Sequence, residues 1–284
     1  MTILLISVYI PTHNRVELLA AAIRSVLAQQ FTDFELIVVD DASTDGTASF
    51  LESVAASDRR VRFIRNHRPC GAPVSRNKAI SQACGEFVTG LDDDDQFAPQ
   101  RLGELHAYWS TLSRCNVATS CIYTQDVLIS DEREVGITKK HGSVDFFDLV
   151  KSNQIGNQIF APKSTFEAAG LFDERLPAWQ DLELFMRIVK GFGPARLLDI
   201  PLYRFDVTPS RSRISSKQDK VRAAYKLVSD RHCAGDQRSK QQLMLQMFSA
   251  YYGIRPRPAD FAYFVRMGFY PRGLAALLAR SLRA

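Results

Sequence analysis

The first 115 residues alternate between short apolar segments and stretches with helical periodicity. The apolar segments span residues 3–10, 34–40, 61–65 and 86–91, and the helical stretches span residues 18–29, 47–56, 74–83 and 99–112. This alternation predicts an α/β fold in which a mostly parallel sheet is covered by helices on both faces. In open sheets of this kind, ligands bind beyond the carboxyl ends of the strands.

Polar clusters follow three of the four expected strands, at residues 11–14, 40–46 and 92–95. The third cluster is a run of four aspartates, whose carboxylates repel one another. Such a run at a strand end is typical of a site for a hard cation that is shared with nucleotide phosphates. An isolated acidic run is more often a solvated loop, and a single turn gathers Asp and Ser as helix caps. Three clusters on one rim favour a diphosphate substrate.

Composition excludes several classes of protein. The chain has 284 residues, 46% hydrophobic and 24% charged, which excludes disordered and fibrous proteins and suits one sizeable core or a core with a smaller lobe. A net charge of +5 suits anionic small molecules or lipid surfaces and is too small to indicate nucleic acid.

Cysteines and apolar runs bear on the compartment. The five cysteines are widely spaced and contain no C-x-x-C pair, so we expect reduced thiols in the cytoplasm. We expect residues 3–10 to form a buried strand rather than a signal peptide, and no run of 18 apolar residues predicts a membrane-spanning helix.

Together with residues 71–77, 85–95 and 179–184, these clusters resemble the inverting glycosyltransferases of family 2, which have the GT-A fold and include bacterial enzymes of cell-surface polysaccharide synthesis. The likeness covers roughly residues 4–205, and the order and spacing of the motifs make it specific. It implies a GT-A catalytic domain over residues 1–215, with a nucleotide-sugar half at 1–115 and an acceptor half at 116–215. A helical extension would follow at 216–284.

The resemblance implies a uridine site at the first two turns. Asp40 would accept the uracil imide N–H, while the turn after the first strand lies against the base and His13 stacks on it. His13 can instead be a plain turn residue, and Arg76 can form an ordinary salt bridge on a helix surface. The residues implied to bind the UDP-sugar are Pro11, Thr12, His13, Asn14, Asp40, Asp41, Arg76, Asn77, Asp92 and Asp93.

The same resemblance implies Mn²⁺ or Mg²⁺ at the aspartate run. The D-x-D pattern of the family fits Asp92 and Asp94, with the metal most directly on Asp94 and the sugar nearer Asp92 or Asp93. The run is redundant, so the assignment of individual ligands stays open. A divalent cation would neutralise the charge that develops on the departing diphosphate.

Asp181 occupies the position of the catalytic base in the family, at the start of an amphipathic helix. Many relatives have Glu before this Asp, whereas here Gln180 precedes it. Asp181 can instead be a helix N-cap, and Glu183 is a rival base on another face of the helix. Trp179 is either a platform for an acceptor sugar or a core residue.

The segments after residue 205 resemble the family less. Residues 208–216 combine hydroxyls and arginines, so we expect a loop from which Arg211 or Arg213 can close over the diphosphate. Further helices are expected, and the chain beyond Asp260 mixes arginines with aromatic and aliphatic residues and has no acidic residue. Such a tail indicates peripheral contact with the inner membrane, or packing on the fold.

The sequence therefore predicts a metal-dependent inverting transferase at the cytoplasmic side of the membrane. It would move a hexose or N-acetylhexosamine from a UDP-sugar to a glycan or lipid-linked acceptor of a cell-surface polysaccharide, and it would form a β linkage. One alternative is a non-catalytic UDP-sugar-binding or scaffold protein. Another is a nucleotidyltransferase, which would need a glycine-rich triphosphate loop where residues 11–14 stand.

Overall fold

A computed structural model describes residues 5–208 and 218–282, so Arg211 and Arg213 lie outside the described residues. The amino-terminal half has the expected parallel strands, in the spatial order β3-β2-β1-β4. These strands are β1 (Ile6–Thr12), β2 (Phe34–Asp40), β3 (Val61–Arg65) and β4 (Phe87–Gly90). The connecting helices are α1 (Val16–Leu27), α2 (Thr47–Ser57), α3 (Ala72–Gln82) and α4 (Arg101–Arg114).

Beyond β4 the sheet becomes mixed. Strand β9 lies antiparallel between β4 and β6, and β10 continues the sheet parallel to β6. Three short strands pair antiparallel at its edges, β5 and β8 with β10 and β7 with β6. These strands are β5 (Gln96–Phe97), β6 (Ile122–Ser130), β7 (Arg133–Ile137), β8 (Ser143–Val144), β9 (Phe160–Pro162) and β10 (Ala195–Asp206).

Two apolar clusters cover the two faces of the sheet. Along β1, Val8 and Ile10 point into the cluster under α1 and α4, whereas Tyr9 points into the cluster under α3. Successive strand residues face opposite sides, so a sheet buried on both faces needs continuous apolar strands. The polar residues are thereby left to the strand ends, where the turns form the site.

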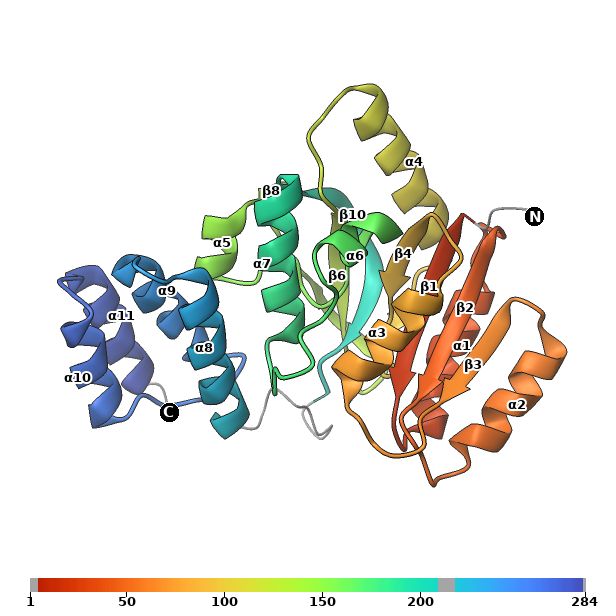
Figure 1. The fold of residues 1–284 in the computed structure, drawn as a ribbon, viewed down its shortest axis with the longest axis horizontal. Coiled ribbons are helices and arrows are strands. Elements are labelled where there is room, and N and C mark those ends of the chain that lie inside the picture. The colour runs from red at the N-terminus through yellow and green to blue at the C-terminus, as the bar shows by residue number, and fades with distance from the viewer. Residues whose placement is uncertain (1–4, 209–217, 283–284) are drawn as a thin grey trace.

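The carboxyl-terminal helices lie at the opposite end of the molecule from α2 and β3 (Figure 1). Helix α9 packs against α5 and α8, while α11 packs against α9 and α10. Between the sheet and these helices lie α5 (Phe146–Lys151) and α7 (Gln180–Phe192), whereas α6 (Lys163–Ala168) packs against β9, α3 and α7 (Figure 1). The terminal helices are α8 (Gln218–His232), α9 (Gln237–Met247), α10 (Pro258–Arg266) and α11 (Pro271–Ser281).

The apolar core continues across the expected domain boundary at residue 215. Leu243 and Met244 of α9 belong to the same buried cluster as Phe185 of α7. The side chain of Gln246 is buried as well, and its Nε2 donates hydrogen bonds to the carbonyl oxygens of Leu149 (2.9 Å) and Val150 (3.3 Å). The helical extension is therefore packed onto the acceptor half.

The last two helices have a buried and an exposed side. Phe264 and Leu277 are buried against the other helices, whereas Phe269 is 88% exposed and Leu282 is 84% exposed. Of the two possibilities left open by the sequence, packing on the fold is thus present, and an outer apolar surface remains. Among the residues that the structure describes, no helix is long and apolar enough to cross a membrane.

Candidate active site

A cavity of about 960 Å³ lies at the carboxyl ends of β1 and β4 and extends toward α9 and α11. One end is lined by the turn after β1, the start of α3 and the aspartate run, and the other end by β6, the loops at 138–140 and 151–157, and residues after α9. The cavity lining includes ten of the expected site residues: Pro11, Thr12, His13, Asp41, Arg76, Asp92, Asp93, Asp94, Trp179 and Asp181.

Asp92 is held on three sides. Its carboxylate accepts hydrogen bonds from Arg76 Nη2 (2.9 Å), Asn157 Nδ2 (2.8 Å) and Gln158 Nε2 (3.0 Å). Asn157 and Gln158 precede β9, the strand that lies antiparallel to β4. The mixed half of the sheet therefore fixes the orientation of this carboxylate at the cavity wall.

Arg15 connects the next two aspartates. Its Nη1 atom lies 3.1 Å from Asp93 Oδ1 and 3.0 Å from Asp94 Oδ2, and Thr12 Oγ1 donates to Asp93 Oδ2 at 2.8 Å. Burial raises the pKa of Asp93 to about 6, with Arg15 opposing the shift and Asp94 adding to it. The guanidinium thus offsets part of the repulsion within the run.

Asp95 differs from the rest of the run because it is buried inside the fold. Its carboxylate accepts hydrogen bonds from the Tyr203 hydroxyl (2.7 Å) and from the Asp206 backbone N–H (2.8 Å). Burial raises the pKa of Asp95 well above its usual range, and the charges of Asp94 and Asp92 add to the effect. Asp92 and Asp94 are therefore the two carboxylates of the D-x-D pattern that face the cavity.

No complete metal-ligand cluster is present among the described residues. Over residues 5–208 and 218–282, no three His, Cys, Asp or Glu side chains are grouped so that they could hold an ion. The carboxylates of Asp92 and Asp94 nevertheless provide hard oxygen donors, which are the ligands that Mg²⁺ and Mn²⁺ prefer. Their chemistry fits a shared ion whose remaining ligands come from substrate and solvent.

Asp40 lies below the cavity floor, and the cavity lining does not include it. The residue is fully buried, and its Oδ1 accepts the Ser43 backbone N–H at 2.9 Å. Its Oδ2 lies 3.4 Å from Arg65 Nε and has no hydrogen-bond partner. A buried carboxylate oxygen without a donor is costly, so this atom can still accept one.

Asp41 and Asn14 fix the turns around Asp40. The Asp41 carboxylate accepts the backbone N–H groups of Cys70 (2.8 Å) and Gly71 (2.7 Å), which fixes the entry to α3. Asn14 Oδ1 accepts the Thr44 backbone N–H at 2.7 Å, which links the turns after β1 and β2. Asp41 faces the cavity and Asn14 does not.

Arg76 joins the two ends of the site. Its Nη1 atom lies 3.2 Å from Asp181 Oδ1 and donates to Gln180 Oε1 at 3.2 Å, while Nη2 reaches Asp92. The guanidinium also lies 5.2 Å from the centre of the Phe172 ring. Burial lowers the pKa of Arg76, but Asp181 and Asp92 raise it more, so the net shift is upward. Arg76 is a buried link between elements rather than a surface residue.

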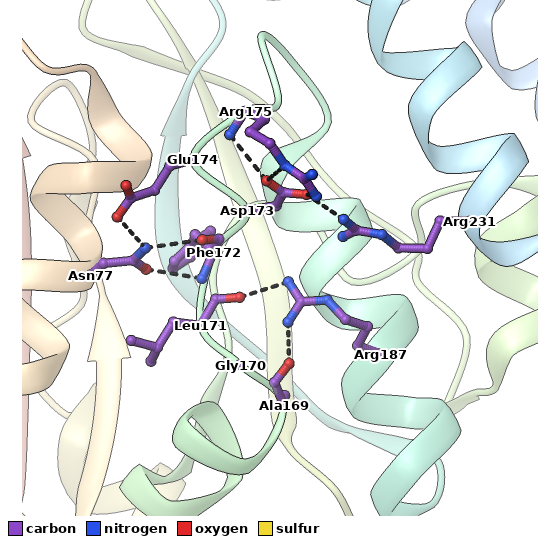
Figure 2. A pocket seen from close by; sticks show the side chains of 10 residues that line it. All are labelled: Asn77, Ala169, Gly170, Leu171, Phe172, Asp173, Glu174, Arg175, Arg187 and Arg231. Carbon is purple, nitrogen blue, oxygen red and sulfur yellow. Dashed lines mark hydrogen bonds and ion pairs between the residues drawn. The ribbon is translucent and has the colours of Figure 1, made fainter.

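Asn77 faces away from this cavity and binds the turn that precedes α7 (Figure 2). Its Nδ2 donates to the Phe172 carbonyl (2.9 Å) and to Glu174 Oε1 (3.0 Å), and its Oδ1 accepts the Phe172 N–H (2.9 Å). Arg187 holds the same turn by donating to the Leu171 carbonyl at 2.6 Å. Within a smaller hollow of about 460 Å³, Asn77 thus holds the turn that precedes α7.

Asp181 is the second residue of α7 and lines the cavity. Trp179 precedes the helix in a left-handed conformation (φ 60°), and no side chain caps this end, so the structure does not use Asp181 as an N-cap. Burial raises the pKa of Asp181 to about 6, Arg76 opposes the shift and Asp92 adds to it. A carboxyl group with such a pKa is mostly ionised at neutral pH.

Glu183 is placed differently from Asp181. It is 1% exposed and accepts hydrogen bonds from Arg187 Nη2 (2.7 Å), Arg231 Nη1 (2.6 Å) and His232 Nε2 (3.0 Å). Burial would raise its pKa, but the hydrogen bonds from His232, Arg187 and Arg231 lower the pKa of Glu183 to about 2. Glu183 is therefore an ion-pair centre between α7 and α8, remote from the cavity lining.

Trp179 borders the cavity but is mostly buried, with 7% of its surface exposed. Its ring packs near Tyr225 and Tyr252, with ring centres 6.5 Å and 6.1 Å away. This position agrees with the core alternative and leaves little ring surface for stacking on a sugar. The more exposed aromatic side chains of the cavity are Tyr251 and Tyr252.

Sequence reasoning missed several residues of the site. Arg15 directly follows the polar cluster at residues 11–14, and this position could have indicated that it belongs to the site. Asn157 lies in a segment, residues 156–163, that resembles the acceptor side of the family, but its contact with the aspartates was not foreseen, and Tyr203 comes from β10, which carries no motif. Tyr252 lies in the helical extension, where nothing in the sequence indicates a site.

Comparisons with known proteins identify the family. The model of the family "Glycosyl transferase family 2" matches residues 7–165. A putative colanic acid biosynthesis glycosyl transferase of Escherichia coli, WcaA, is 31% identical over 87% of this chain and 87% of its own. The chain therefore belongs to glycosyl transferase family 2 and is a glycosyltransferase. The nucleotidyltransferase and non-catalytic alternatives are thereby set aside.

Two further proteins show partial or distant similarity. A Campylobacter jejuni GalNAc(5)-diNAcBac-PP-undecaprenol beta-1,3-glucosyltransferase is 33% identical over 55% of this chain and 54% of its own. Residues 1–349 of S. aureus TarS, solved with UDP-GlcNAc, superpose with a TM-score of 0.69 at 16% identity, over 98% of this chain and 88% of that chain. The chain spans about half, 53%, of the longer TarS structure. This likeness confirms the expected GT-A fold.

Proposed function

We propose that the enzyme transfers a hexose or N-acetylhexosamine from a UDP-sugar, with inversion, to a glycan or lipid-linked acceptor in cell-surface polysaccharide synthesis. The observation that carries this proposal is the guanidinium of Arg76, which contacts both Asp92 and Asp181. A carboxylate for the diphosphate side and a carboxylate suited to be a base thus lie on either side of one cation. Inverting transfer needs these two groups on opposite sides of the reacting sugar.

The names of the similar proteins support this substrate class. One is named for colanic acid biosynthesis, one for transfer to a diphosphate-linked undecaprenol, and TarS was solved with UDP-GlcNAc. In the present chain, Asp40 Oδ2 would accept the uracil imide N–H, because it makes no hydrogen bond with the described residues and has only a 3.4 Å ion pair with Arg65 Nε there. Thr12 and His13 line the cavity beside it and would contact the base.

Asp92 and Asp94 would hold Mn²⁺ or Mg²⁺ together with the diphosphate oxygens. Bound there, the ion would neutralise charge on the leaving group. Arg15 now pairs with Asp94, and its guanidinium would turn toward a phosphate when the ion binds. Asp93, hydrogen-bonded to Thr12, would lie nearest the ribose or sugar.

Asp181 would act on the acceptor. As the acceptor oxygen attacks the anomeric carbon from the face opposite UDP, the bond between that carbon and the diphosphate oxygen breaks and the hydroxyl proton moves to Asp181. The displaced electron pair leaves on UDP. An α-linked donor would thereby give a β linkage. A general base of this kind contributes roughly 10² to 10⁴ in rate.

We propose peripheral contact with the cytoplasmic face of the membrane through the last two helices. Exposed Phe269 lies between Arg266 and Arg272 in the sequence, and exposed Leu282 follows Arg280; apolar side chains next to cations bind anionic lipid. This arrangement would bring the acceptor end of the cavity close to a lipid-linked substrate, since Arg280 of α11 lines that cavity.

A donor and acceptor screen tests the proposed function. UDP release would be measured for a set of UDP-sugars with and without glycan and lipid-diphosphate acceptors, and the product linkage would be determined by NMR. We expect release that depends on the acceptor and a product of inverted anomeric configuration. A retained configuration, or transfer only from other nucleotide sugars, would contradict the proposal.

A further inference from the structure

The end of the cavity remote from the aspartates is lined by cations. Lys139, Lys151 and Arg280 come from three separate segments and line the same space. Lys139 is exposed and forms no ion pair with any residue in the described part of the chain. Lys151 is 56% exposed and lies 3.5 Å from Asp148, which is a loose surface pair of little energetic weight.

A fourth lysine at this end is already neutralised. Lys140 Nζ lies 2.7 Å from Asp126 Oδ2 and donates to the Ile155 carbonyl at 2.9 Å. Both side chains are nearly buried, so this pair is a fixed part of the wall. The remaining lysines therefore give this end a positive potential, opposite in sign to the aspartate end.

Aromatic side chains line the same end of the cavity. The rings of Tyr251 and Tyr252 lie 4.9 Å apart at 88°, and Tyr252 packs near Trp179. The indole N–H of Trp179 is buried and lies beside Tyr252, whose pKa is raised by burial with Trp179 opposing the shift. The tyrosine rings are therefore the aromatic surface that the cavity offers to a sugar.

The helical extension is rigidly connected to this wall. Gln246 of α9 donates to the carbonyl oxygens of residues 149 and 150, and its Oε1 accepts the Asn153 backbone N–H at 3.0 Å. The loop at 151–157, which carries Lys151 at its start, is thereby fixed to the helix that precedes the two tyrosines. Segments that are far apart in the sequence thus form one surface of the cavity.

We propose that this surface is an acceptor subsite for an anionic saccharide. The tyrosines would pack on the sugar, and Lys139 and Lys151 would bind a phosphate or carboxylate group attached to it. The inference rests on the proposed function, because it assigns the acceptor of the same reaction. The diphosphate of a lipid carrier and the carboxylate of an acidic sugar both supply such an anion, and the test separates the two.

Binding to the UDP-saturated enzyme tests the subsite without requiring turnover. Isothermal titration would compare methyl glucoside, methyl glucuronide and a glucosyl diphosphate with a short prenyl chain. We expect at least one anionic probe to bind roughly ten-fold more tightly than the neutral probe, as one or two charge-assisted hydrogen bonds provide. Tighter binding of the diphosphate would identify a lipid carrier, and tighter binding of the glucuronide an acidic sugar.

Variants separate charge recognition from sugar packing. In Lys139→Ala/Lys151→Ala the preference for the anionic probe should disappear, whereas the matched variant Lys226→Ala, an exposed lysine of α8 outside the cavity lining, should keep it. Tyr251→Ala should weaken neutral and anionic probes by the same factor. Tyr251 is 57% exposed, so the fold should tolerate this change.

Several outcomes would overturn the inference. They are equal affinity for neutral and anionic probes, absence of binding by every anionic probe, or a preference that survives in the double lysine variant. UDP affinity, measured by a separate titration of the enzyme without bound UDP, distinguishes the two proposals. If the wild type binds UDP but shows no preference for anionic probes, the subsite alone is contradicted. If the wild type does not bind UDP, the proposed function is contradicted.

Discussion

Arg76 Nη1 and Asp181 Oδ1 lie 3.2 Å apart, so the residue proposed as the base forms an ion pair with a buried guanidinium before any substrate binds. The same guanidinium contacts Asp92 at 2.9 Å. The charge of Asp92 therefore affects the pKa of Asp181. Binding of a cation near Asp92 would relieve part of the repulsion that raises the pKa of Asp181.

The first prediction concerns pH. A carboxylate base is active only when deprotonated, so kcat should fall as pH falls through the Asp181 pKa of about 6. Gln180→Glu places a second carboxylate beside Arg76 and should move this acid limb upward by about one pH unit. The measurement is kcat against pH, with Gln180→Met as the neutral control. An unmoved limb in the Glu variant would count against Asp181 as the titrating base.

The second prediction concerns the metal. Asp92 and Asp94 offer oxygen ligands, which Mn²⁺ and Mg²⁺ prefer. EDTA should therefore abolish transfer, and either ion should restore it. Asp94→Ala should remove the effect of metal on UDP affinity in isothermal titration. Asp230→Asn, which changes an exposed carboxylate of α8, serves as the control. Full activity in EDTA would refute the assignment of a metal to this run.

The third prediction concerns stability. Glu183→Ala leaves Arg187, Arg231 and His232 without their shared acceptor, so the free energy of unfolding should fall by about 3 kcal/mol. Urea denaturation measures this loss, with Glu167→Ala, an exposed pair with Lys163, as the control.

The pH dependence of that stability has a definite sign. The folded-state pKa of Glu183 is about 2, below the ordinary value of 4.5, so its contribution is complete above pH 4.5 and is lost as pH falls through 2. The variant should therefore lose less stability than the wild type on acidification. If the folded variant instead kept full stability and lost only kcat, Glu183 would be a better candidate for the base than Asp181.

The fourth prediction concerns the membrane. Phe269→Ser/Leu282→Ser changes two exposed side chains and should reduce sedimentation with vesicles that contain phosphatidylglycerol. Transfer to a soluble acceptor should persist, because neither residue lines the cavity. Deleting residues 269–284 is a poorer test, because Tyr270 stacks on Phe264 of α10 and Leu277 is buried. Unchanged sedimentation would argue against lipid contact at this surface.

The parallel half of the fold could be predicted because its strands are buried on both faces. The bounds of β2 and β3 agree with the apolar segments 34–40 and 61–65. The later strands carry weaker signals, since β9 has only three residues and β7 is exposed throughout. Their pairing depends on contacts far apart in the sequence, which periodicity does not reveal.

The site was less completely predictable for the same reason. Short motifs brought Asp92, Asp94, Arg76 and Asp181 to one cavity, as the resemblance implied. A motif does not show where each side chain points, so the hydrogen bonds of Asn77 to a neighbouring turn could not be foreseen. Tyr252 reaches the cavity through the packing of α9 on α5, and no local pattern encodes that contact.

The most direct measurement compares Asp181→Asn with Asp40→Ala, using UDP titration and single-turnover transfer. We expect Asp181→Asn to keep near-normal UDP affinity and to lose roughly 10²-fold or more in transfer rate, whereas Asp40→Ala should weaken UDP binding. A transfer rate in Asp181→Asn equal to the wild type, or a loss of UDP affinity as large as in Asp40→Ala, would contradict this expectation.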